Sequence, residues 1–133
     1  RLWVVHRLDV GVGGVVVFAK SAAFAREVQG MMERGEIRKV YVAEVEGEFV
    51  GGEGEVVECR EKLAFNAKTH RGSVDPENGK PAHTNFTRLR HSPAKNTSIV
   101  RCALFSGRPH QIRLHLHSLG HPIVNDPLYH PAP

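Results

Sequence analysis

A chain of 133 residues with 41% hydrophobic and 24% charged residues has the composition of a globular domain, which excludes a largely disordered chain. No apolar run approaches the roughly 18 residues of a membrane-spanning helix, so we expect no membrane partner. The net charge of +4, with nine histidines not counted, favours a polyanionic partner. The length suits one hydrophobic core, so we expect a single domain over residues 1–133.

The first predicted elements are a turn, a strand and a helix. Three glycines between Gly11 and Gly14 indicate the turn, and the apolar run 15–18 that follows predicts a strand buried on both faces. Ser21 then suits a helix N-cap, and apolar residues recur at helical spacing until Gly35. The sequence therefore predicts a helix between Ser21 and Gly35.

The middle of the chain predicts strands around a long polar segment. Residues 39–45 mix aromatic and β-branched side chains, which favours a strand that ends at Gly47. Residues 66–81 are rich in turn formers and have no apolar period, so we expect an exposed loop. Strand patterns return at residues 84–89 and 98–105, separated by the turn-like HSPAKN.

The last predicted element covers residues 109–119. Its apolar residues fit either a strand or a helix. We favour the helix, because Pro109 suits a first helical turn and Gly120 suits the position after the last one. The segment 121–133 then follows as an extended piece interrupted by prolines.

Asp9, in the stretch HRLDVGVGG, is a candidate catalytic carboxylate. An aspartate beside glycines most often forms a turn with its own backbone, and the alternative is a nucleophile or general base on a loop. That role requires a cation that keeps the carboxylate ionised. Arg113 is a candidate, because it borders the apolar stripe of the predicted helix, where a guanidinium needs an acid partner. A solvated basic helix face is the alternative for Arg113.

The histidines and cysteines do not predict a metal site. His110, His115 and His117 are spaced by five and two residues, whereas one helix face requires spacings of three or four. Cys59 and Cys102 stand alone without a CxxC pair, which fits a reducing compartment inside the cell. Cytoplasm, nucleus and mitochondrion all remain open.

Three stretches carry a family resemblance. HRLDVGVGGVVVFAK resembles the HRLD motif of the RluA-type pseudouridine synthases, RKVYVAEVEGEF resembles their second motif, and SGRPHQIRLHLHSLGHPIVNDPLY resembles their third. The three motifs occur in the family's order and span positions 6–129. The sequence of the last motif is most similar to that of the eukaryotic tRNA-modifying branch of the family.

The resemblance implies an α+β fold, with a mixed, mostly antiparallel sheet and flanking helices. It implies an enzyme that converts uridine to pseudouridine in structured RNA and needs no cofactor or metal. We expect the protein to be a monomer. By motif position, Asp9 takes the place of the catalytic aspartate, Tyr41 that of the tyrosine that contacts the target base, and Arg113 that of the arginine that pairs with the aspartate. From the residue alone, Tyr41 is a core or rim tyrosine, or a platform for a base.

Four further residues are candidates for RNA binding. Arg7 lies two positions before Asp9 and is suited to stack in the space that a flipped base leaves, or to bind phosphate. Lys39, Arg108 and His110 are expected phosphate contacts. We expect tRNA rather than rRNA as the partner.

Two departures from the family pattern matter. Val12 and Gly13 replace a threonine and a serine, so an inactive RNA-binding module descended from such enzymes is the second hypothesis. A metal-dependent hydrolase that uses the histidines is a third. Family members also carry some tens of residues before HRLD, so we expect residues 1–133 to lack the N-terminal strands of the domain.

Overall fold

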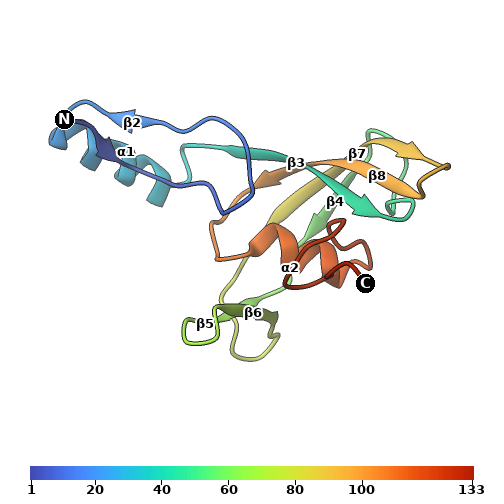
Figure 1. Ribbon diagram of the computed structural model, residues 1–133. Helices are drawn as coiled ribbons and strands as arrows, with labels where there is room; N and C mark the ends of the chain where they lie inside the picture. Colours follow the sequence, from blue (N-terminus) through green and yellow to red (C-terminus); the bar gives the residue numbers. More distant parts are fainter. The chain divides into compact units, whose positions relative to one another are not determined.

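A computed structural model describes all 133 residues, which form two compact units, Arg1–Ile37 and Arg38–Pro133 (Figure 1). Each unit has buried apolar side chains of its own. Strands pair only in antiparallel fashion, and two helices accompany them. The mostly antiparallel α+β architecture that we expect is therefore confirmed. No helix has the length and apolar content needed to cross a membrane.

The first unit is built from two short strands and one helix: β1 (Trp3–Val4), β2 (Phe18–Ala19) and α1 (Ala22–Glu33). Strands β1 and β2 pair through two residue pairs, and α1 packs on them through a cluster formed by Val5, Ala19 and Val28. The predicted helix is confirmed with both of its ends. The Ser21 hydroxyl accepts a hydrogen bond from the Phe24 amide at 3.1 Å, and Gly35 follows the helix at φ 69°.

The strand predicted for residues 15–18 is wrong over most of its length. Only Phe18 belongs to a strand, and Val15, Val16 and Val17 are exposed. A strand requires a neighbour with which its backbone can pair, and β1 offers only two residues. The Val17 amide instead donates a hydrogen bond to His6 Nε2 at 2.9 Å, so a side chain replaces the strand partner there.

The second unit contains six strands and one helix: β3 (Lys39–Glu46), β4 (Val56–Cys59), β5 (Leu63–Asn66), β6 (Arg71–Val74), β7 (Thr84–Ser92), β8 (Thr97–Leu104) and α2 (Gln111–Ser118). Four strands form one sheet in the order β3-β8-β7-β4, and β5 and β6 form a separate hairpin. The strands predicted at residues 39–45, 84–89 and 98–105 are confirmed as β3, β7 and β8. Each contributes at least one buried apolar residue: Val45 in β3, Phe86 in β7, and Val100 and Cys102 in β8.

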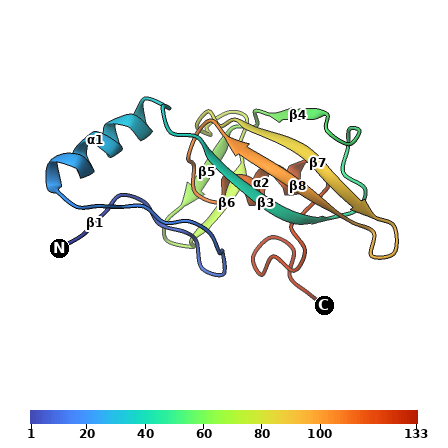
Figure 2. The same ribbon diagram turned by 90° about the horizontal axis from the view of Figure 1, so that it is seen from above.

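Helix α2 covers one face of this sheet (Figure 2). Its Leu116 is fully buried with residues of the sheet, while Leu114 packs with Leu63 of β5 and belongs to a second cluster. The helical alternative for this segment is thus confirmed, and Gly120 follows it at φ 84°. Pro109 lies before the N-cap, His110, rather than in the first turn as expected. The helix is held between the sheet and the hairpin.

The exposed loop predicted for residues 66–81 is wrong in part, because it contains β6. The Asn66 carboxamide accepts hydrogen bonds from the amides of Lys68 and Thr69, which closes the turn between β5 and β6. Gly72 lies at the packed position of β6, where a Cβ atom would be 2.6 Å from Leu114 Cδ1. Strand β6 therefore packs through a glycine, which leaves no apolar pattern in the sequence.

Candidate active site

The predicted site residues are divided between the two units. The first unit carries Arg7 and Asp9, and the second carries Lys39, Tyr41, Arg108, His110 and Arg113. Asp9 lies in the exposed loop between β1 and β2. The Val12 amide donates a hydrogen bond to the backbone carbonyl of Asp9 at 3.1 Å, and Gly11 within this turn has a positive φ of 82°. Because the backbone closes this turn, the turn does not require the Asp9 carboxylate.

Arg113 has an acid partner within the second unit that the sequence did not reveal. Its Nε donates to Asp126 Oδ2 at 2.8 Å and its Nη2 donates to Asp126 Oδ1 at 2.6 Å. The side chain of Asp126 is 3% exposed and that of Arg113 is 22% exposed. A two-bond contact between a planar guanidinium and a carboxylate fixes both the position and the orientation of the guanidinium.

The Asp126 carboxylate is also bound by the chain that follows it. Its Oδ1 accepts hydrogen bonds from the amides of Leu128 at 3.0 Å and Tyr129 at 3.3 Å. Burial alone would raise the pKa of this carboxyl, but the bonds from Arg113 and from the two amides outweigh it and lower the pKa below its ordinary value. Asp126 is therefore an ionised, preformed anchor for Arg113.

His110 and Arg113 both contact Tyr129, so the structure brings these two predicted residues together. His110 Nδ1 lies 2.7 Å from the Tyr129 hydroxyl oxygen, and the Arg113 guanidinium lies 4.9 Å from the centre of the tyrosine ring. The only sequence signal for Asp126 and Tyr129 is their place in NDPLY, at the end of the third motif. Sequence reasoning gave neither of them a role.

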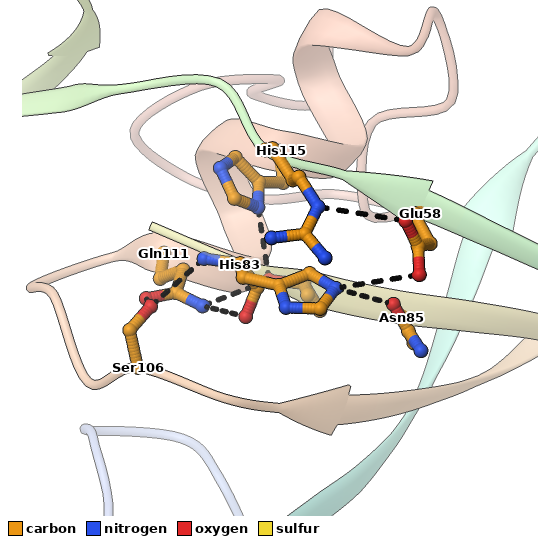
Figure 3. Close-up of polar contacts among 8 residues, drawn as sticks. Glu58, His83, Asn85, Ser106, Gln111 and His115 are labelled. Carbon is orange, nitrogen blue, oxygen red and sulfur yellow. Dashed lines mark hydrogen bonds and ion pairs between the residues drawn. The ribbon is translucent and has the colours of Figure 1, made fainter. Parts of the chain in front are cut away.

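Gln111 is a third residue that the sequence analysis missed (Figure 3). It is buried at the start of α2, where its side-chain oxygen accepts hydrogen bonds from Ser106 Oγ at 2.7 Å and from the Arg108 amide at 3.1 Å. Its side-chain nitrogen donates to the His83 carbonyl at 3.0 Å and to Thr84 Oγ1 at 2.9 Å. Gln111 thus ties the loop that carries Arg108 to strand β7.

His115 continues this network and is a structural histidine. Its Nε2 lies 2.8 Å from the Glu61 carbonyl, which can only accept, so Nε2 carries the proton. Nδ1 then accepts from the Thr84 hydroxyl at 2.9 Å. Burial lowers the pKa of His115 below its ordinary value of 6.5, so the ring is neutral. Neither unit contains a group of three or more His, Cys, Asp or Glu side chains arranged to hold a metal ion.

The remaining predicted residues lie on defined parts of the second unit. Tyr41 is half-buried on β3 opposite Cys102 and packs against the main apolar cluster. Lys39 begins the same strand. Arg108 is held against the chain that precedes β7, since its Nε donates to the Pro81 carbonyl at 2.9 Å. All three side chains extend from segments with a fixed backbone.

Comparison with known proteins assigns the chain to a family. The family profile described as RNA pseudouridylate synthase matches residues 1–118, which include Asp9, Tyr41 and Arg113. The chain belongs to this family. It is 45% identical over 125 residues to human pseudouridylate synthase RPUSD2, covering 93% of this chain and 22% of that protein.

Two further relatives are a yeast tRNA pseudouridine synthase and a bacterial RNA pseudouridine synthase. The chain is 39% identical to the mitochondrial tRNA pseudouridine(32) synthase of Saccharomyces cerevisiae, with 93% of this chain and 27% of that protein covered. It is 36% identical to the dual-specificity RNA pseudouridine synthase RluA of Pasteurella multocida, with 95% and 56% covered. The chain thus spans between about a fifth and just over half of these three relatives.

A solved structure shares the fold. Human RNA pseudouridylate synthase domain containing 1 superimposes with a TM-score of 0.85 at 27% identity, covering 97% of this chain and 55% of that one. The pseudouridylate synthase fold expected from the three motifs is therefore confirmed. Human RNA pseudouridylate synthase domain containing 4, at 24% identity and a TM-score of 0.75, shares the fold as well.

Proposed function

We propose that this chain carries the catalytic core of an RNA pseudouridine synthase, with Asp9 as its catalytic carboxylate. The family match over residues 1–118 is the observation that carries the proposal, because it includes the HRLD stretch together with Tyr41 and Arg113. The preformed pair of Arg113 and Asp126 adds a physical argument. A guanidinium held in one orientation is suited to bind a second anion without reorganisation.

The proposed reaction is an isomerisation within one nucleotide. The bond between N1 of uracil and C1' of the ribose breaks, the uracil turns within the pocket, and a bond forms between C5 and C1'. The hydrogen at C5 leaves as a proton, and N1 gains a proton, so no oxidant, reductant or cofactor is consumed. Three actions of Asp9 fit this balance: attack at C6, attack at C1', or removal of a proton from the sugar.

Tyr41 and Arg113 support Asp9 in this proposal. Arg113 stabilises the negative charge of the Asp9 carboxylate during the reaction. Tyr41 stacks on the uracil while it turns and assists the relocation of the C5 proton. The half-buried position of Tyr41 on β3 suits this role, because the strand fixes its backbone and the residue is not fully buried.

The proposed substrate is an RNA loop within tRNA. The name of the yeast relative, a tRNA pseudouridine synthase, favours tRNA over rRNA. Because the target base must leave its stack at a cost of a few kcal/mol, a loop is a better substrate than a duplex. Arg7 fills the vacated space or binds phosphate, and Lys39, Arg108 and His110 contact phosphates. Such a substrate places the activity inside the cell.

Tritium release from RNA labelled at C5 of uridine tests this function directly, since C5 loses its hydrogen only when the new carbon–carbon bond forms. The full chain and its Asp9→Asn variant are compared on tRNA and on rRNA. We expect release by the parent alone, with equal RNA binding by both proteins. Release by the variant would remove Asp9 from the proposal. Binding without release by the parent would favour the inactive RNA-binding module.

A further inference from the structure

Tyr129 connects three segments that are far apart in the sequence. It lies in the segment after α2, which ends at the C-terminus in Figure 1. Its hydroxyl oxygen is 2.8 Å from the backbone nitrogen of Gly72 in β6 and 2.7 Å from Nδ1 of His110, the N-cap of α2. One hydroxyl group thus joins the β5–β6 hairpin to the beginning of the helix that carries Arg113.

Only one of these two hydrogen bonds has a direction set by its partner. The Gly72 amide can only donate, so the hydroxyl oxygen of Tyr129 accepts from it. When the hydroxyl hydrogen of Tyr129 points to Nδ1 of His110, the imidazole proton lies on Nε2, and we expect this tautomer because it uses the donor of the hydroxyl group. The contact also fixes the orientation of the His110 ring.

The backbone around Tyr129 is adapted to this contact. His110 adopts a left-handed conformation at φ 56°, which is unfavourable for a residue other than glycine, and its side chain makes no capping bond to α2. A Cβ atom at position 72 would lie 3.4 Å from the Tyr129 hydroxyl oxygen and 2.6 Å from Leu114 Cδ1. A side chain at position 72 would therefore contact the Tyr129 hydroxyl and overlap Leu114.

The ring and the amide of Tyr129 both act on the surroundings of Arg113. The ring centre lies 4.9 Å from the Arg113 guanidinium and 5.2 Å from that of Arg71. The Tyr129 amide donates to Asp126 Oδ1, the same oxygen that accepts from Arg113 Nη2. A guanidinium bound at its edge by a carboxylate and on its face by an aromatic ring has little freedom to rotate.

We propose that Tyr129 is a positioning residue that aligns Arg113 for the reaction by linking the hairpin, the N-terminus of α2 and the Asp126 carboxylate. The proposal rests on the proposed function, in which Arg113 acts on Asp9. Tyr129 needs no contact with the RNA in this role. Its removal therefore changes the chemical step more than the binding of substrate, most of whose affinity comes from phosphate contacts.

Tyr129→Phe in the full chain tests this role, because it removes the hydroxyl and keeps the ring beside Arg113. Ser98→Ala is the matched control. Its buried hydroxyl also bridges two backbone groups, accepting from the Phe49 amide at 3.0 Å and donating to the Gly47 carbonyl at 2.7 Å. Tritium release gives kcat and KM for each protein at a temperature where all three are folded by circular dichroism.

We expect Tyr129→Phe to lower kcat about tenfold with KM for RNA changed less than twofold, because a less well aligned Arg113 stabilises the transition state less while the phosphate contacts stay in place. Tyr129→Ala, which also removes the ring, is expected to lower kcat further. Ser98→Ala is expected to keep the parental kcat. An equal loss of kcat in Ser98→Ala and Tyr129→Phe, or a rise in KM with kcat unchanged, would overturn the positioning role.

A spectroscopic measurement separates this proposal from the proposed function. Long-range proton–nitrogen correlation spectra report which ring nitrogen of His110 carries the proton. We expect the Nε2 tautomer in the parent and a mixture of tautomers in Tyr129→Phe. An unchanged tautomer in the variant would contradict the link, even if the parent were inactive on every RNA tested. An inactive parent with the expected tautomer change would contradict only the synthase function.

Discussion

The carboxylate of Asp126 binds the guanidinium of Arg113 through two hydrogen bonds, 13 residues apart in the sequence and from opposite sides of the turn that ends α2. Arg113 is the arginine of the HQIR stretch, and Asp126 belongs to NDPLY. Two parts of one sequence motif thus form a single ion pair. The pair explains why an arginine can lie at the border of an apolar helix face.

Asp126→Asn is expected to lower the free energy of unfolding by about 2 kcal/mol, because it leaves a partly buried guanidinium without its charged partner. Urea denaturation at pH 7 measures the change. Glu46→Gln is the control, since the side chains of Glu46 and its partner His130 are 39% and 43% exposed, more than those of Arg113 and Asp126, and their charged atoms lie 3.7 Å apart. We expect less than about 0.5 kcal/mol there. Equal losses in the two variants would contradict the importance of the buried pair.

His115 predicts how stability depends on pH near neutrality. Its pKa is lowered in the folded protein, so between that value and 6.5 the unfolded chain binds more protons than the folded one. The free energy of unfolding is therefore expected to fall as the pH drops below 6.5, and the contribution of His115 is fully present above that pH. Urea denaturation at pH 7.5, 6.5 and 5.5 measures the slope.

The titration of the His115 ring itself supports or contradicts this assignment. In nitrogen-resolved spectra we expect it to gain its second proton only at a pH below 6.5. The His117→Gln variant, changed at an exposed position of the same helix, is expected to keep the parental slope. A His115 ring that became charged at or above pH 6.5 would show that burial does not hold its neutral form.

Gly72→Ala is expected to destabilise the second unit by about 1–3 kcal/mol, because the added methyl group overlaps Leu114 and approaches the Ala64 carbonyl at 3.2 Å. Gly107→Ala is the control, since no atom lies within 4 Å of a Cβ atom at that position. Thermal unfolding of both variants measures the difference. A Gly72→Ala protein as stable as the Gly107→Ala protein would show that the hairpin can move away from α2 without cost.

Local patterns sufficed for most elements of the fold. Ser21 and Gly35 mark the ends of α1, and Gly120 marks the end of α2, because capping uses side chains and backbone angles close to the helix itself. The strand β6 escaped detection because its packed residue, Gly72, has no side chain to reveal the buried face. The strand predicted for residues 15–18 was wrong because an apolar sequence does not show whether a pairing strand exists beside it.

The site shows the same division between local and distant information. The three motifs named Asp9, Tyr41 and Arg113, and their roles remain predictions. Asp126 was not found, since nothing near Arg113 in the sequence indicates a carboxylate 13 residues later. Sequence reasoning assigned no role to Gln111, because its four hydrogen bonds go to two distant segments. His83 and Thr84 lie at the start of β7, Ser106 and Arg108 lie after β8, and only the folded chain brings them together.

The position of Tyr129 and Asp126 has a practical consequence for drawing the boundary of this domain. The family profile ends at residue 118, one turn after Arg113, whereas the hydrogen bonds that orient Arg113 come from residues 126–129. A chain that ended at residue 118 would keep Asp9, Tyr41 and Arg113. It would lose Asp126 and Tyr129, which orient Arg113. A boundary for expression or for domain exchange between family members is therefore better placed after Tyr129, where the hydrogen bonds to Arg113 and Asp126 are complete, than at the end of the matched profile.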